Sequence, residues 1–219
     1  TSGPPETLAA ALVLVPTRRA VRSLREAFLR QSGGRPLILP MIRPLGDVDE
    51  DDLSLSLIGE AEAIADLPPA ISPLTRRLML ARRIHGAAPL LGNMGDEQAA
   101  QLADALAVFL DEVATAEADF ADLKGLVEDG ELSEHWQTTL RFLDAVIADW
   151  PQELKRLGCL DPAHRRRMLM DRLAEHWQHQ PPATPIIAAG STGTIPATAR
   201  LLATIAGLPE GAVVLPGLD

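Results

Sequence analysis

The 219-residue sequence contains only two lysines, one cysteine and no tyrosine. The single cysteine, Cys159, excludes an intramolecular disulfide and any multi-cysteine metal site. Neither Lys124 nor Lys155 follows a glycine loop, so the chain has no G-x-x-x-x-G-K-[ST] phosphate loop. No apolar run reaches 18 residues, and the first residues lack the basic region of a secretory signal. We therefore expect a cytoplasmic protein with no membrane partner.

Composition and charge narrow the class of protein further. Hydrophobic residues make up 47% of the chain and the mean hydropathy is +0.08, which suffices for a globular core. The net charge of −10 argues against nucleic-acid binding by the whole surface. The charges are segregated, however: residues 16–35 carry six arginines against Glu26 alone, and residues 47–66 carry eight acids and no base. Such segregation favours one phosphate-facing surface, although solvated helix faces produce similar counts.

The two ends of the chain show alternating strand and helix patterns. The first end predicts a strand at 11–15 (ALVLV), a helix that Thr17 can cap and that stops at Gly33-Gly34, and a strand at 36–40 (PLILP). The second end predicts a strand at 185–189 (PIIAA), a helix at 196–206 and a strand at 211–217 (GAVVLPG). Strands that alternate with helices indicate a parallel sheet.

The stretch between these ends is helical throughout. We expect four helices: Ser72-Pro73 to about Gly86; a cap at Asp96 to Thr115; Leu132 to Gly158 with a bend at Pro151; and Asp161-Pro162 to near Gln180. The simplest topology joins both ends in one sheet, with an α/β domain formed by 1–45 and 183–219 and a helical insertion subdomain at 46–182. Thr1 is not an initiator methionine and Asp219 directly follows a strand, so we expect a fragment of a longer protein.

The loop Gly190-Ser191-Thr192-Gly193 is the first candidate for phosphate contact. It follows a predicted strand and precedes a predicted helix, so its amides can meet an anion at the helix N-terminus. The alternative is an ordinary strand-to-helix turn whose glycines permit tight backbone geometry, with Pro196 in the first helical turn. The loop is not a G-x-S-x-G nucleophile elbow, and no catalytic residue is predicted.

An arginine stripe is the second candidate. Arg18, Arg22 and Arg25 recur at helical spacing on the face opposite Val21, Leu24 and Phe28, where they can follow a row of phosphates. The alternative is an exposed face paired with Glu26 or with the acids at 47–52.

Several longer segments resemble AddB proteins of the alphaproteobacterial type. They are VLVPTRRAVRSLREAFL (13–29), IRPLGDVDEDDL (42–53), LPPAISPLTRRLMLARRI (67–84), EHWQTTLRFL (134–143) and the whole stretch 185–219. The resemblance covers nearly the entire chain and corresponds to the N-terminal, helicase-like part of that family. It implies a partial superfamily-1 helicase-like α/β domain of P-loop topology without its Walker A region, with a large helical insertion.

The resemblance also implies a function. AddB subunits work with an AddA-type helicase-nuclease in double-strand break repair, bind DNA as single strands and duplex ends, and recognise the Chi hotspot. They generally do not drive translocation, and their nuclease domain and iron–sulfur cysteines would lie outside this chain. The segment 16–20 (PTRRA) matches a strand-end segment that touches single-stranded DNA in helicases. The candidate DNA-binding residues are therefore Thr17, Arg18, Arg19, Arg22, Arg25, Ser191 and Thr192.

At the end of the strand 185–189, the resemblance places the acidic Walker B motif of active helicases. Here Ala188 and Ala189 occupy these positions, and no Asp-Glu pair is present to hold magnesium. We therefore expect no cofactor and no ATP chemistry in this fragment, whose parent protein would be a helicase/exonuclease subunit.

Other patterns have simpler interpretations. His176 and His179 could join Glu175 or Cys159 as metal ligands. The alternative is a polar helix end without a metal, and because a zinc site needs three or four converging ligands, no metal site is predicted. The three tryptophans could stack bases but are typical of core anchors. The arginines at 76–77, 82–83 and 165–167 are candidate DNA or subunit contacts, or else solvated faces.

Two alternatives to the DNA-binding hypothesis stay open at this point. One is a helical scaffold or adaptor whose β/α remnant is structural. The other is a P-loop-like enzyme completed by residues upstream of Thr1.

Overall fold

A computed structural model describes residues 8–45, 66–90, 92, 94–120 and 132–217, without the side chains of 132–135. The chain forms two compact units, which are described separately. Unit 1 comprises Thr1–Asp66 and Met168–Asp219, and unit 2 comprises Leu67–Arg167. The acidic stretch 47–52 lies outside the described residues. Within the described ranges, no helix has the length and apolar character needed to cross a membrane.

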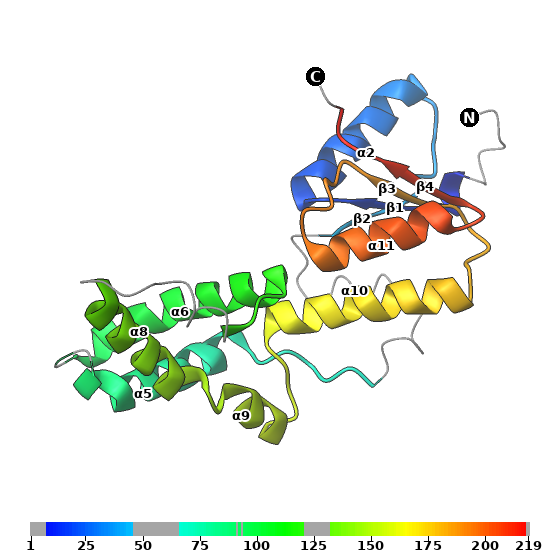
Figure 1. Ribbon diagram of the computed structural model, residues 1–219. Coiled ribbons are helices and arrows are strands. Elements are labelled where there is room, and N and C mark those ends of the chain that lie inside the picture. Colours follow the sequence, from blue (N-terminus) through cyan, green and yellow to red (C-terminus); the bar gives the residue numbers. More distant parts are fainter. Residues whose placement is uncertain (1–7, 46–65, 91, 93, 121–131, 218–219) are drawn as a thin grey trace. The chain divides into compact units, whose positions relative to one another are not determined.

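Unit 1 contains a parallel sheet of four short strands in the order β2-β1-β3-β4 (Figure 1). The strands are β1 (Leu12–Val15), β2 (Met41–Pro44), β3 (Ile186–Ala189) and β4 (Gly211–Val214). The central pair aligns Leu12 with Ile186 and Leu14 with Ala188. The prediction that the two ends of the chain join in one parallel α/β sheet is therefore confirmed.

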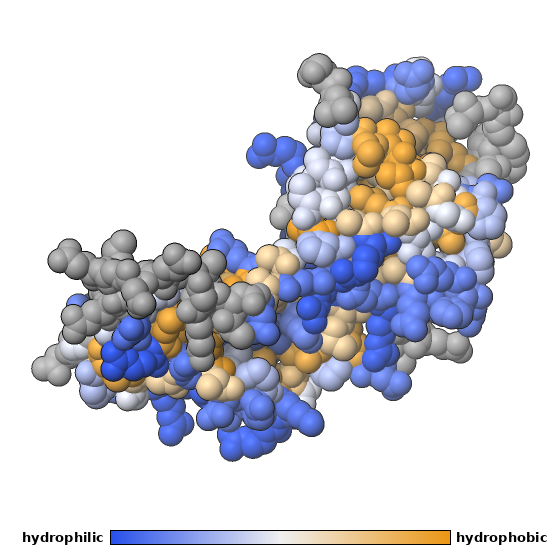
Figure 2. Space-filling model, viewed as in Figure 1, coloured by the Kyte–Doolittle hydropathy of each residue, from blue (hydrophilic) through white to orange (hydrophobic). Residues whose placement is uncertain are grey.

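Helices cover the two faces of this sheet differently. α2 (Arg18–Ser32) packs through Val21, with Leu24 and Phe28 beside it, on the face that carries Val13, Val15 and Ile42. α11 (Pro196–Gly207) lies on the opposite face in Figure 1, with Leu201 and Ile205 fully buried. This division follows from right-handed crossovers, because β2 lies outside β1 and β4 lies outside β3. Beside α2, apolar residues of the sheet gather at the surface (Figure 2), and Val214 is 56% exposed.

The C-terminal half of α10 (Pro162–His179) belongs to unit 1. It packs along α11, where Arg200 pairs with Asp171 at 2.7 Å and Gln178 Nε2 donates to Thr204 Oγ1 at 3.1 Å. The unit boundary therefore falls inside a helix, between Arg167 and Met168, whereas the predicted insertion extended to residue 182. Met170, Leu173 and Trp177 of this half are buried, and Met170 Sδ lies 3.7 Å from Thr198 Oγ1 of α11.

The second strand was placed wrongly from the sequence. Residues 36–40 form no strand, and β2 instead occupies the next four residues. Leu12 pairs with Met41 and Val15 with Pro44, and the Met41 amide donates to Ala11 O at 3.0 Å. Pro36 and Pro40 carry no N–H to donate to a ladder, so the PLILP segment is a poor strand despite its apolar side chains.

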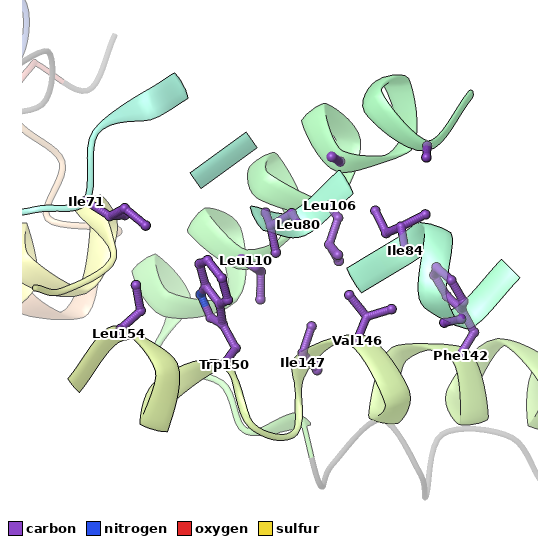
Figure 3. Packing of buried hydrophobic residues seen from close by; sticks show 13 residues of the cluster. Ile71, Leu80, Ile84, Leu106, Leu110, Phe142, Val146, Ile147, Trp150 and Leu154 are labelled. Carbon is purple, nitrogen blue, oxygen red and sulfur yellow. The ribbon is translucent and has the colours of Figure 1, made fainter. Parts of the chain in front are cut away.

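Unit 2 is helical. Its elements are α5 (Pro73–Ala87), a 3₁₀ turn (Ala88–Leu90), α6 (Asp96–Ala116), α8 (Leu132–Ile147), α9 (Trp150–Arg156) and the first residues of α10. Buried side chains from α5, α6, α8 and α9 form its core (Figure 3), including Leu80, Leu106, Val146 and Trp150. Ile71, from the segment before α5, joins them. The only strand-like pairing in the described part of unit 2 is an isolated parallel bridge between Ala70 and Leu160.

The helix starts confirm most of the predicted caps. Thr17 accepts a hydrogen bond from the Ala20 amide at 3.1 Å, and Ser72 accepts one from Thr75 at 3.2 Å. Two predictions were wrong in detail. Gly95 occupies the cap position of α6, with Asp96 in the first turn, where its charge suits the helix dipole. Pro151 does not bend one long helix but is the second residue of the separate α9, where a missing N–H costs nothing.

A buried arginine organises the polar groups of unit 2. The Arg76 side chain is 6% exposed, and its guanidinium contacts Asp161 Oδ1 at 2.8 Å through Nε and Asp111 Oδ1 at 2.9 Å through Nη2. Asp161 Oδ2 also accepts a hydrogen bond from Trp150 Nε1 at 2.6 Å. Arg165 is likewise buried and donates to Pro68 O at 2.9 Å. Arg76 and Arg165 are therefore structural, and their interpretation as surface contacts was wrong.

His164, at the start of α10, gives unit 2 a predicted dependence on pH. Burial lowers the pKa of His164, as does the Arg167 guanidinium, and these outweigh the opposing effect of Asp161. The unfolded chain then takes up a proton near pH 6.5, and the folded unit does so only at lower pH. The free energy of unfolding should consequently fall as the pH drops below about 6.5. Urea unfolding at a series of pH values should show a smaller decline for His164→Gln.

Asp161 has the opposite effect on how the free energy of unfolding depends on pH, because burial raises its pKa despite the attraction of Arg76. Its contribution to stability grows as the pH falls toward its usual range. The difference between the free energies of unfolding of the original protein and of His164→Gln, taken at each pH, gives the contribution of His164 alone. A difference that is constant from about pH 8 to pH 5 would contradict the lowered pKa of His164.

Candidate nucleic-acid interface

The carboxyl edge of the sheet in unit 1 contains a topological switch point. From β1 the chain crosses outward to β2, and from the adjacent β3 it crosses outward to β4. The ladder between β1 and β3 ends at Leu14 and Ala188, one residue before the outer ladders end at Val15 and Ala189. The two central strands therefore part first. Ligands of open α/β sheets bind in the crevice at such a point.

Two loops meet at this crevice. The first is Pro16-Thr17, between β1 and α2, and the second is the Gly190–Ile195 stretch, between β3 and α11. A Cβ placed on Gly190 would lie 3.6 Å from Pro16 Cδ, so the loops are in van der Waals reach. In Figure 1 both helices begin at this edge of the sheet. The structure thus brings together the two stretches that sequence reasoning nominated separately.

The first loop is ordered by its own helix cap. The Thr17 hydroxyl accepts the Ala20 amide, which leaves its O–H to donate outward. Arg18, Arg19, Arg22 and Arg25 are all exposed on α2. The first turn of α2 carries no acid, so Arg18 and Arg19 add positive charge to the positive end of the helix dipole. This placement costs about 0.3–1 kcal/mol per residue unless an anion offsets it.

The second loop uses its hydroxyls partly for internal contacts. Gly190 and Gly193 have φ of 79° and 67°, a backbone region that favours glycine. Ser191 Oγ accepts the Gly193 amide at 3.4 Å, and Thr192 Oγ1 contacts Thr194 Oγ1 at 3.5 Å. Thr192 is exposed and Ser191 half-buried. Ile195 caps α11 without a side-chain hydrogen bond, so the first amides of α11 have no side-chain acceptor from their cap.

One residue at this edge was missed by sequence reasoning. Arg43 lies one position before the carboxyl end of β2 and is half-buried. Its Nε atom is buried and has no hydrogen-bond partner in the part of the chain that the structure describes. The signal was present in the sequence, but it required placing the strand at 41–44 instead of 36–40.

The other candidate groups do not extend this site. Trp150 and Trp177 are buried, at 2% and 1% exposure, as expected of core anchors. Over the described ranges, no group of three or more His, Cys, Asp or Glu side chains is placed to hold a metal ion.

The chain matches no protein-family model and no curated protein.

Proposed function

We propose that this chain is the helicase-like N-terminal region of an AddB-type subunit, and that its carboxyl sheet edge binds the phosphate backbone of single-stranded DNA. One observation carries the proposal: the loop after β1 and the loop after β3 touch at a switch point, through Pro16 and Gly190. Residues nominated from two distant stretches of sequence thereby lie in or after two adjoining loops, which carry guanidinium, hydroxyl and amide donors. These are the groups that contact phosphates.

The charges of α2 support an anionic ligand. Four exposed arginines follow the loop, and within α2 the only acid is Glu26, which pairs with Arg30 at 4.0 Å near the other end of the helix. Among the described residues, positive charge is therefore concentrated in the first half of α2, in a chain whose net charge is −10. A local excess of this kind attracts a polyanion even when the protein as a whole is acidic.

Within the described part of the carboxyl sheet edge, the end of β3 offers none of the groups that ATP hydrolysis would require. β3 ends at Ala188 and Ala189, whose methyl groups can neither hold magnesium nor polarise water. The role we propose is therefore to hold DNA and to assemble with an AddA-type helicase-nuclease in double-strand break repair, without chemistry in this region.

The proposal predicts a directed loss of DNA binding. The variant Arg18→Glu/Arg22→Glu should bind a labelled single-stranded oligonucleotide at least about ten-fold more weakly. The slope of log K against log salt should become less steep by about 0.7 for each phosphate that the variant no longer neutralises. Fluorescence anisotropy at four salt concentrations measures both quantities. Glutamates in the first turn suit the helix dipole, so the fold should be preserved.

The matched control is Arg30→Glu/Arg35→Glu. It changes the net charge by the same amount, but at the opposite end of α2, near the Gly33 cap. We expect affinity and salt slope close to those of the original protein. Equal losses in both variants would indicate non-specific attraction, and no loss in either would favour the scaffold hypothesis.

A further inference from the structure

Unit 2 contains a cavity of about 680 Å³ that no part of the proposed DNA-binding function uses. It lies among the C-terminal end of α6, α9, the turn at 158–161 and the first turns of α10, all within unit 2. Its volume falls in the range typical of sites for small organic molecules.

The walls of the cavity are mainly apolar. Leu110, Ile147, Trp150 and Leu154 form its floor and belong to the core of unit 2 (Figure 3). The Trp150 ring is held in place by the hydrogen bond from Nε1 to Asp161 and by Arg83, whose Cζ lies 5.8 Å from the ring centroid. Trp150 is 2% exposed, so it supports the cavity wall from within the core, and the largely apolar wall suits the apolar body of a ligand.

Three carboxylates, Glu117, Asp119 and Asp161, and two cations, Lys155 and Arg167, line the cavity. Asp161 is already neutralised by Arg76 at 2.8 Å, and Glu117 and Asp119 each have an interaction partner. Arg167 is half-buried and contacts the His164 ring, with Nη2 3.4 Å from Nδ1. Across the described residues, no carboxylate pairs with Arg167 or with Lys155.

His164 does not give Arg167 a negatively charged partner. Because burial and Arg167 lower its pKa, the imidazole is neutral at pH 7. Its Nδ1 then accepts from Arg167, which places the ring proton on Nε2 as a further donor. Arg167 and His164, both on α10, thus present N–H donors to a largely apolar cavity.

We propose that this cavity binds a small organic acid, with its apolar body against the apolar wall and its carboxylate paired with Arg167. The apolar walls, together with a guanidinium that no carboxylate of the described residues pairs with, define this class. A neutral apolar molecule would leave the guanidinium half-buried and unpaired, and a purely polar anion would leave the apolar wall without a partner.

The test compares 1-naphthaleneacetate with its neutral amide by isothermal titration calorimetry at pH 7.5. The acid should bind at one site with a dissociation constant below about 1 mM, and the amide about ten-fold more weakly. Arg167→Gln should weaken binding of the acid about ten-fold and leave the amide unchanged. The control Arg156→Gln makes the same charge change on the exposed side of α9, where Arg156 pairs with Glu153 at 2.6 Å, and should alter neither.

A second variant keeps the proposal testable if Arg167→Gln disturbs the fold. Ala114→Trp places a large ring at the cavity wall and should abolish binding of both compounds, with the circular dichroism spectrum unchanged. Equal binding of acid and amide, or no binding of the acid at 1 mM, would overturn the proposal. It would also fail if sedimentation showed a self-association that Ala114→Trp removes, because the cavity would then be an interface between two copies.

Discussion

Replacement of Arg76 by leucine should lower the free energy of unfolding by about 3–5 kcal/mol, which is a large fraction of the stability of an ordinary domain. The Arg76 side chain is 6% exposed and bridges Asp111 and Asp161, whose side chains are 40% and 14% exposed. Without the guanidinium, the Asp161 carboxylate stays buried with Trp150 Nε1 as its remaining partner among these groups. A buried charge that loses its counterion destabilises far more than the pair itself stabilises. Urea unfolding followed by tryptophan fluorescence measures the loss.

The neighbouring Arg77 provides the control. It pairs with Asp104 at 2.9 Å, but both side chains are about half exposed, at 48% and 55%. Arg77→Leu should therefore cost between about 0 and 1 kcal/mol. Removing Arg76 also removes the attraction that lowers the pKa of Asp161. The loss of unfolding free energy caused by Arg76→Leu should therefore become smaller as the pH falls and Asp161 takes up a proton. This account would be contradicted if both variants lost similar amounts of unfolding free energy, or if the loss in Arg76→Leu did not depend on pH.

Gly211→Ala should destabilise unit 1 by about 3 kcal/mol or more, the upper end of the cost of overpacking. A Cβ at this position would lie 1.8 Å from Ile205 O and 2.8 Å from Leu208 Cβ. Both neighbours are held in place: Ile205 is fully buried, and Leu208 O accepts a hydrogen bond from the Gly211 amide at 3.1 Å. Either β4 or the end of α11 must move. Urea unfolding by circular dichroism, with hydrogen exchange of the β3 and β4 amides, measures the effect.

Gly207→Ala is the matched control for this prediction. Gly207 is the last residue of α11, four positions before Gly211, and a Cβ there meets nothing within 4 Å. Because alanine favours the helix more than glycine does, this change should be neutral or stabilising by up to about 1 kcal/mol. If both variants behaved alike, backbone propensity would explain the result and the close approach of α11 to β4 would not.

Local signals predicted the first strand and helix well. These signals are local in sequence: they are the apolar run at 11–15, the cap at Thr17 and the stop at Gly33. Each of them corresponds to a feature of β1 or α2 in the structure. The position of β2 could not be read in this way. MIRP has little strand propensity of its own and forms a strand because Ala11 and β1 offer a ladder at that register.

Other features depend on residues far apart in the sequence. Arg76 looks like one of several surface arginines until Asp111 and Asp161 are brought to it, and the unit boundary inside α10 depends on what each half of the helix packs against. The residues of the candidate DNA site were predicted, but their juxtaposition required the strand order. The cavity in unit 2 left no sequence motif, because apolar side chains that line a hollow and those that fill a core look the same in sequence.

The pairing of β1 with β3 also governs when the sheet can form on the ribosome. The edge of β1 that meets Ile186 has no partner until that residue emerges, which at about 5–20 residues per second takes roughly 10–35 seconds after β1 itself is made. Unit 2 is synthesised before β3 and has its own core. It can therefore fold before β1 has its β3 partner. During that interval the nascent chain carries a strand that can pair with β2 on one edge but has no partner on the other, and this open edge is where chaperones would be expected to bind.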